Sequence, residues 1–343
     1  MTWRGWTLLA VTALAVAFAA AYALIVPPRQ RSAPDETSPS PATALTAPPP
    51  VPFVMLRSLF ADDSHGSMGM VPLSDPGGAR FISGLRCERV FFAAGRGVCL
   101  TMGLEGIVTT YAAEIFDERF EVTGRLPLTG LPSRVRVSPD GRRAGITVFE
   151  TGHSYAESGF STRTTIVDTA SATELAELEQ FSITRDGRPF REVDFNFWGV
   201  TFTADSNRFY ATLASGDTKY LVEGDIDART ARVVTTGVEC PSLSPDNRRI
   251  AYKKAFTDER GLGWHLEVLD IETMTVTPLS AEARSVDDQV EWLDDGHVMY
   301  HLSSARGADV WALDVGGREP PRMLIPMAYS PAVVRKQEVR SEK

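Results

Sequence analysis

Two histidines are the first candidates for chemistry, because His297 and His301 stand four positions apart. On an α-helix that spacing would turn both imidazoles toward one metal ion. The residues around them alternate as a strand does, and residues four apart on a strand lie about 13 Å from each other. We therefore interpret the two as loop or strand-surface side chains and predict no metal site.

Nucleophilic catalysis and calcium binding both lack their motifs. A serine hydrolase of the α/β type needs G-x-S-x-G, which this sequence does not contain. Asp140, Asp205 and Asp246 recur through the chain, but none stands in a D-x-D-x-D-G calcium loop. Each lies at a turn-like position, where an Asp side chain bonds nearby backbone amides. We predict no catalytic residue, no cofactor and no bound metal.

The three cysteines are too few for a disulfide scaffold and lack the spacing of a zinc ribbon. Cys87 and Cys99 flank one turn on strands expected to be antiparallel neighbours. In an exported protein they could form a disulfide, and the alternative is two small buried thiols. Cys240 begins a strand and is expected to be free and buried.

The elements that carry these residues repeat along the chain. Each copy has an alternating strand, a turn that usually contains Asp, and a second alternating strand. Such alternation is typical of half-buried strands, and a further strand pair follows each copy. The copies cover 133–149, 199–214, 240–255 and 289–303, with a degraded copy at 87–103.

Four strands in a unit of about 40 to 50 residues are typical of a β-propeller blade. The first folded stretch lacks an innermost strand, while 327–334 is a strand without a blade, so the two would complete one shared blade. The sequence predicts an all-β, six-bladed β-propeller with four-stranded blades. Open alternatives are a seventh blade hidden between Asp140 and Asp205, or a pair of β-sandwiches. After the shared blade, the blades cover about 84–131, 132–180, 181–237, 238–280 and 281–326.

The repeat carries a family resemblance. The S-P-D-G turn at 138–141, the I-A-Y strand at 250–252 and the L-E-V-L-D strand at 266–270 resemble the repeat of TolB-like β-propellers. Such repeats also occur in the propellers of prolyl-oligopeptidase-like enzymes and in exported bacterial lipoproteins, so the resemblance implies a fold more than a function. Periplasmic TolB proteins carry an N-terminal α/β domain where this sequence has an apolar segment, and no lipobox Cys follows that segment. The resemblance therefore implies a membrane-anchored or exported bacterial member that lacks the TolB N-terminal domain.

The N-terminal region differs in composition from the rest. Residues 6–26 carry no charge and are long enough to cross a bilayer as a helix. Residues 1–26 are then a signal-anchor, which is a transmembrane helix, or a signal peptide that is cleaved after export. Residues 27–52 are rich in Pro, Ser and Thr and predict a linker, followed by the propeller at 53–335 and a charged tail at 336–343. Either interpretation places the propeller outside the cytoplasm, at the cell membrane with a single pass or secreted.

The charge balance argues against nucleic-acid binding. The chain has 343 residues with 35 Lys and Arg against 44 Asp and Glu, a formal net charge of −9. A nucleic-acid binder would show the opposite, basic excess.

Two stretches, 151–165 and 184–198, are longer than a blade turn needs. Long loops on a rigid scaffold often carry binding residues, and aromatic and Arg side chains are typical interface anchors. The alternative is that the aromatics at the end of the second stretch begin a strand and fill the core between blades. The candidate partner-binding residues are His153, Tyr155, Phe160, Arg188, Arg191, Phe197 and Trp198.

These observations predict a non-catalytic, extracytoplasmic propeller that acts as a protein-binding scaffold for another protein of the cell envelope. The alternative function is sensing of a small ligand or glycan in the central funnel. An enzymatic alternative, a propeller lyase or lactonase, would need His or Glu ligands clustered at the inner strands. Partner binding predicts an exposed aromatic patch on one face, while ligand sensing predicts a polar funnel with aromatic walls.

Overall fold

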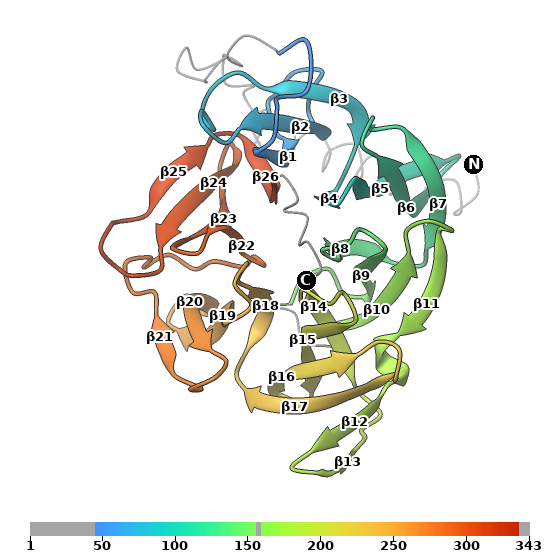
Figure 1. Ribbon diagram of the computed structural model, residues 1–343, viewed down its shortest axis with the longest axis vertical. Coiled ribbons are helices and arrows are strands. Elements are labelled where there is room, and N and C mark those ends of the chain that lie inside the picture. Colours follow the sequence, from blue (N-terminus) through green and yellow to red (C-terminus); the bar gives the residue numbers. More distant parts are fainter. Residues whose placement is uncertain (1–44, 156–158, 336–343) are drawn as a thin grey trace, which may run out of the picture. The chain divides into compact units, whose positions relative to one another are not determined.

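Six β-sheets form the blades of a propeller around a central axis in the computed structural model (Figure 1). The structure describes residues 45–155 and 159–335. The six blades confirm the prediction from the repeat and leave no seventh blade in the described chain. Each blade packs between two neighbouring blades, so inner strands such as Leu131–Val137 and Arg208–Ser215 are buried on both faces.

The first blade is closed by both ends of the folded chain, as predicted. Its strand order is β26-β1-β2-β3, with the C-terminal strand innermost. Phe53 of β1 pairs with Val334 of β26 in antiparallel register, and Val54 and Val333 lie in one buried cluster. The ring therefore has no open edge at its seam. The strands are β26 (Ala328–Val334), β1 (Phe53–Ser58), β2 (Ser67–Pro72) and β3 (Phe81–Arg86).

Four further blades each contain four antiparallel strands in chain order. Blade two has β4 (Arg89–Ala93), β5 (Arg96–Glu105), β6 (Val108–Asp117) and β7 (Val122–Leu128). Blade three has β8 (Leu131–Val137), β9 (Arg143–Thr151), β10 (Ser161–Asp168) and β11 (Thr173–Glu177). Blade five has β18 (Glu239–Leu243), β19 (Arg249–Asp258), β20 (Gly261–Asp270) and β21 (Val276–Pro278). Blade six has β22 (Glu291–Asp294), β23 (His297–Ser304), β24 (Gly307–Asp314) and β25 (Arg322–Ile325).

Blade four is larger than predicted, because a two-stranded arm extends its outer edge (Figure 1). The arm follows a short 3-10 helix, Leu178–Gln180, and its first strand pairs in parallel with the last strand of the blade. The arm, at 182–190, lies within the long interval between Asp140 and Asp205 and adds to its length. The strands are β12 (Ser182–Arg185), β13 (Arg188–Phe190), β14 (Asn196–Phe202), β15 (Arg208–Ser215), β16 (Thr218–Asp225) and β17 (Thr230–Thr236).

The recurrent aspartates cap turns, as predicted. Asp140 Oδ1 accepts the backbone N–H of Arg142 at 3.0 Å, and Asp205 and Asp246 accept backbone N–H groups in the same way. Gly141 has φ +75°, a left-handed conformation that favours glycine in this turn. The carboxylates of these aspartates thus stabilise the turns by accepting backbone N–H groups.

Strand direction gives the propeller two distinct faces. We call the face where the innermost strands begin the upper face, and the opposite one the lower face. Because neighbouring strands are antiparallel, the β5–β6 turn at 105–108 and the β19–β20 turn at 258–261 stand on the upper face. The β20–β21 turn at 270–276 stands on the lower face.

The predicted membrane or signal segment, most of the linker and the C-terminal tail lie outside the described residues. Within the described ranges, no helix is long and apolar enough to cross a membrane.

Candidate functional site

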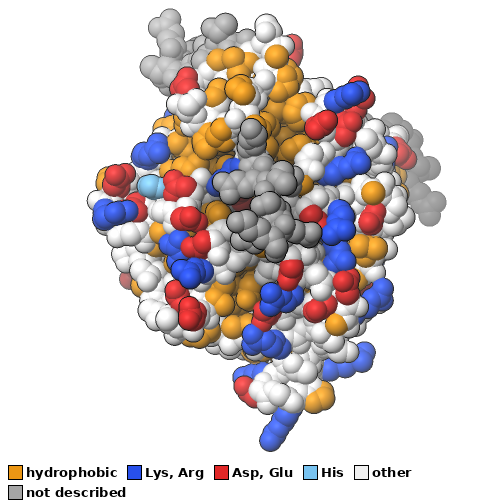
Figure 2. Space-filling view, viewed as in Figure 1, with side chains coloured by type: hydrophobic (Ala, Val, Ile, Leu, Met, Phe, Trp, Pro, Cys, Tyr) orange, Lys and Arg blue, Asp and Glu red, His pale blue; other side chains and the backbone are white. Residues whose placement is uncertain are grey.

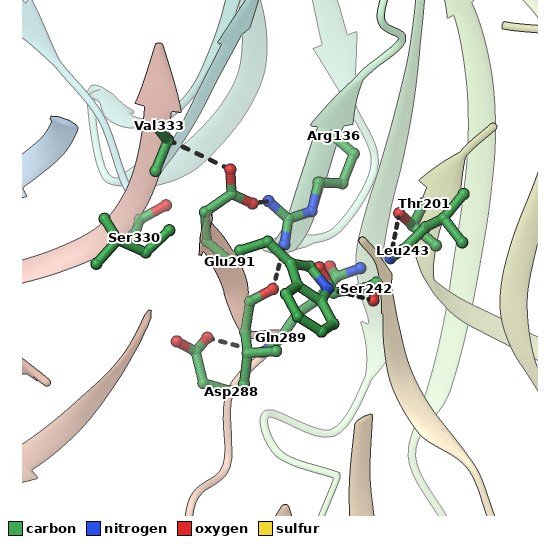
Figure 3. A network of polar contacts seen from close by, with 12 residues as sticks. Arg136, Thr201, Ser242, Leu243, Asp288, Gln289, Glu291, Ser330 and Val333 are labelled. Atoms are coloured by element: carbon green, nitrogen blue, oxygen red, sulfur yellow. Dashed lines mark hydrogen bonds and ion pairs between the residues drawn. The ribbon is translucent and has the colours of Figure 1, made fainter. Parts of the chain in front are cut away.

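A buried ion pair spans the central channel. Arg136 lies on β8 of blade three and pairs with Glu291 on β22 of blade six (Figure 3). These blades are three steps apart in a ring of six, so they face each other across the axis. Arg136 Nη2 also donates to the backbone oxygen of Val290 at 2.7 Å, and Glu291 Oε1 accepts the N–H of Val333 at 3.3 Å. The pair therefore acts as a strut between opposite blades.

Further polar contacts close the channel around this strut (Figure 3). Gln289 Nε2 donates to the backbone oxygens of Val200 at 3.1 Å and Pro241 at 2.8 Å. The Trp292 indole donates to the backbone oxygen of Ser242 at 2.8 Å. Each contact joins two blades, so the channel is divided into a lower recess and an upper funnel.

The lower recess has a volume of about 600 Å³, and its mixed walls include the aromatic side chains of Phe53, Phe91, Phe202 and Trp292. The outer rim is mixed in charge. On the face shown in Figure 2, Lys and Arg side chains are interspersed with Asp and Glu. That face therefore offers no continuous basic surface to a nucleic acid.

The upper funnel has a volume of about 380 Å³. Its charged lining comes from three blades and from the segment that leads into β22. Charged groups of both signs meet in a small, largely buried space, where each interacts more strongly than in water. Those groups are Arg57, Arg89, Arg134, Glu88 and Asp287.

A fully buried lysine stands behind the funnel wall. Lys253 of β19 donates its ammonium N–H to Asp287 Oδ1 and lies 4.1 Å from the ring centre of Trp264. Burial alone would raise the pKa of Asp287, but the charges of Lys253 and Arg134 outweigh it and hold that pKa below its usual range. The Asp287 carboxylate is therefore ionised and already bonded.

His301 is buried in the same region, so the prediction of a strand-surface histidine was wrong for this residue. Its Nδ1 lies 2.7 Å from Asp288 Oδ2, and its ring packs on Tyr329 with ring centres 4.0 Å apart. Burial lowers the pKa of His301, and the nearby guanidiniums of Arg89 and Arg134 add to this against the opposing pull of Asp288. The imidazole is neutral near pH 7. The backbone N–H of His301 donates to Asp288 Oδ2 at 3.1 Å and joins the segment before β22 to β23.

The second histidine of the pair behaves differently. His297 is partly exposed and its Nδ1 lies 2.9 Å from Asp294 Oδ1. No set of three His, Cys, Asp or Glu side chains that could hold a metal ion occurs among the residues placed by the structure.

The predicted partner-binding residues do not form one surface. Phe197 and Trp198 are fully buried, because they begin β14 and fill the core beside the funnel. They offer no exposed surface to a partner, and the alternative weighed for them, core filling, is what the structure shows. Tyr155 is also buried, with its ring centre 5.0 Å from that of Trp198, and Phe160 packs on the same cluster.

The predicted residues that do not only fill the core lie in two distant places, the upper funnel and the outer arm. Tyr155 and His153 line the upper funnel, and the Tyr155 hydroxyl shares a hydrogen bond of 2.6 Å with Ser133. Arg188 and Arg191 are exposed on and beside the outer arm. The structure thus brings two of the seven candidates to a pocket.

Cys87 and Cys99 are joined by a disulfide, the first of the two states considered for them. Cys240 is free and buried, as predicted, and burial raises the pKa of its thiol. It is therefore a protonated side chain of the core.

The funnel charges Arg89, Arg134, Lys253, Asp287 and Asp288 were missed by sequence reasoning. A signal existed, since charged residues at the inner strand of a propeller blade stand where apolar or small side chains would fill the channel. Arg134 and Arg136 alternate with valines in one strand, which marks a polar face.

No protein-family profile matches the chain, and no curated protein matches it in sequence. TolB from Acinetobacter baumannii superposes with a TM-score of 0.59 and 15% identity, over 83% of this chain and 67% of that chain. The two share a fold. A chain of the nidogen/laminin complex superposes with a TM-score of 0.53 and 10% identity, over 82% and 97% of the two chains. The TolB-like resemblance of the repeat is thereby confirmed as a likeness of fold.

Proposed function

We propose that this chain is a non-catalytic propeller that binds a partner protein of the cell envelope through its upper face. One combination of features carries the proposal: the upper face holds a preformed polar funnel and an exposed apolar turn. In the β5–β6 turn, Leu104 is 75% exposed and Ile107 is 98% exposed. Exposed apolar side chains on a face with polar surroundings are typical of protein interaction sites. The exposed side chains are aliphatic, in place of the aromatic patch expected from the sequence.

The buried charges support a binding role over catalysis. Arg136 with Glu291 and Lys253 with Asp287 each join different blades and neutralise each other. Groups held in this way fix the shape of the funnel and are costly to displace. A rigid recess of this kind suits recognition of a ligand that arrives with its shape already matched.

The proposed location is outside the cytoplasm. The Cys87–Cys99 disulfide supports it, because disulfides persist in oxidising compartments. The uncharged stretch at 6–26 supports attachment to the membrane, or export followed by cleavage. Alkylation of intact cells before lysis, followed by mass spectrometry, should find Cys87 and Cys99 oxidised and Cys240 reduced. Reduced Cys87 and Cys99 in cells would contradict this location.

Cross-linking in native membranes, followed by purification of the full chain and quantitative mass spectrometry, tests partner binding. The double variant Leu104→Ser/Ile107→Ser removes the exposed apolar turn without touching the core. Met274→Ser is the matched control, because Met274 is also exposed but stands on the lower face. A partner captured by wild type and Met274→Ser, and at least tenfold less by the double variant, supports the proposal. Equal capture by all three proteins would refute it.

Small-ligand sensing is the second candidate function. Tyr155 and Tyr329 contribute aromatic walls to the polar funnel, which is the arrangement expected for this alternative. Small-ligand sensing would be favoured if the funnel binds a small molecule and no partner protein is captured.

A further inference from the structure

The upper funnel contains more hydrogen-bond donors than its acceptors satisfy. Arg134 lines the funnel with a side chain that is 7% exposed. Its Nη1 donates to the backbone oxygen of Ser133 at 3.1 Å, but its buried Nε has no partner among the described residues. The nearest carboxylate, Asp287, lies 3.8 Å from Nη2, which is longer than a hydrogen bond.

A second guanidinium on the funnel wall is similarly placed. Arg89, the first residue of β4, has a side chain that is 12% exposed and lies over the ring of Tyr329 at 4.3 Å. Its Nη1 is 3.9 Å from Asp288 Oδ1, again beyond hydrogen-bond distance. Two nearly dry guanidiniums therefore line one small pocket, and neither lies within hydrogen-bond distance of the carboxylate beside it.

The carboxylates beside them are committed to closer donors. Asp287 Oδ1 accepts the ammonium of Lys253. Asp288 Oδ1 accepts the N–H of Gln289 at 2.9 Å, and its Oδ2 accepts the N–H of His301 at 3.1 Å. Because a buried donor without an acceptor costs free energy, an anion that entered the funnel would gain bonds that the protein itself does not supply.

We propose that the upper funnel binds a carboxylate, held by the guanidiniums of Arg89 and Arg134. Three guanidiniums and two carboxylates form the charged lining, so one positive charge is in excess, which matches a singly charged group. A carboxylate has the planar, two-oxygen geometry that a guanidinium bonds best. The volume of about 380 Å³ lies at the small end of ligand sites. It suits an end group, such as the C-terminus or an acidic side chain of an extended segment.

This inference rests on the proposed binding function and assigns the ligand class of the same face. Its test uses titration calorimetry of the full chain at fixed ionic strength. The probes are the acetylated tripeptide of alanine as the free acid, the same peptide as the amide, sodium acetate and inorganic phosphate. The free acid should bind at least tenfold more tightly than the amide. If the free acid also exceeds acetate, the source is a peptide terminus, and equal affinities point to a small free carboxylate.

The variants Arg89→Lys and Arg134→Lys keep the charge but lose the planar fork, so neither strands Asp287 or Asp288 without a cation. Each should weaken free-acid binding tenfold or more. Arg260→Met is the matched control, because Arg260 is an exposed arginine of an upper-face turn that pairs with Asp258. It should bind as wild type does. Where a Lys variant fails to fold, the difference between acid and amide in wild type still decides the proposal.

Three results would overturn it: no carboxylate probe binds at millimolar concentration, acid and amide bind equally, or phosphate binds more tightly than any carboxylate. The two proposals fail separately. If partner capture depends on Leu104 and Ile107 but no carboxylate binds, the protein-binding function stands and the carboxylate proposal fails. If a carboxylate binds but no partner protein is captured, the funnel is a small-molecule site and the protein-binding function fails.

Discussion

Removal of one end of the channel strut should destabilise the whole ring. In Arg136→Met, Glu291 keeps its charge but loses its cation inside a channel where its side chain is 11% exposed. Breaking a buried ion pair on one side costs about 3–5 kcal/mol. Arg136 also donates to Val290, which places the expected loss of unfolding free energy in the upper half of that range. At about 2–4 °C per kcal/mol for a large domain, the melting temperature should fall by about 8–20 °C.

A double variant makes this reasoning refutable. Replacing both partners, in Arg136→Met/Glu291→Leu, leaves no unpaired charge, so the double variant should be more stable than Arg136→Met alone. Arg260→Met is the surface control, because exposed pairs contribute only about 0–1 kcal/mol. Urea unfolding followed by tryptophan fluorescence gives all four free energies. The reasoning fails if Arg136→Met is no worse than Arg260→Met, or if the double variant is the least stable protein of the set.

Three further predictions test the disulfide, a close approach between two blades, and a turn. The Cys87→Ser/Cys99→Ser variant should lose about 3 kcal/mol of unfolding free energy, from the loop entropy of a 12-residue separation, and a reducing agent should lower the melting temperature of wild type only. Gly199→Ala should lower the unfolding free energy by about 2–3 kcal/mol in urea unfolding. Residue 199 has φ +67°, and the new Cβ would lie 2.7 Å from the Cα of Cys240. Gly187→Ala should cost less than half of that, because residue 187 has φ +72° but open space around it. Burial would raise the pKa of Asp205, but hydrogen bonds from the turn outweigh it and hold that pKa well below its usual range. The ionised Asp205 therefore stabilises the fold fully above the unfolded pKa of about 4, and this stabilisation is lost as the pH falls further. Asp205→Asn should melt at a lower temperature than wild type at pH 7, and the difference between the two melting temperatures should shrink below pH 4.

The blades could be predicted because their signals are local. The turn around Asp140 is specified by residues within five positions of one another, and the strands on either side alternate in the sequence itself. The closing strand could be predicted for a similar reason, since an unpaired strand at one end and a three-stranded blade at the other require each other. The arm on blade four had no such signal. Ser182 pairs with Thr230 in parallel, and the two are distant in sequence. The sequence of neither segment therefore indicates that it pairs with the other.

The burial of Phe197 and Trp198 depended on register, which the sequence left open. The pairing of β14 with β15 shifts between Trp198 and Thr201, and Gly199 stands within this irregularity at positive φ. A shift of one residue exchanges the two faces of a strand. The same residue types could therefore have formed an exposed anchor or a core, and only the three-dimensional register separates the two.

The funnel could not be predicted because its members meet only when the ring closes. Arg136 and Glu291 are separated by 155 residues, and the contacts of Arg89 and Arg134 with the segment before β22 are equally distant. Alternation in β8 marks a polar face in the sequence, but which charges meet depends on which blade lies opposite it.

This dependence on ring closure couples the funnel to the strut. Arg134 and Arg136 lie two positions apart on β8, so they share the face that points into the channel. Their partners, Asp287 and Glu291, also lie close together, on the segment that enters β22. One strand and one opposing segment thus set both the channel closure and the funnel wall. A change at Arg136 should therefore move Arg134 and alter ligand binding as well as stability, whereas the Lys variants at Arg89 and Arg134 should alter binding with little loss of stability. Comparison of these two sets of variants separates the shape of the funnel from the chemistry of its donors.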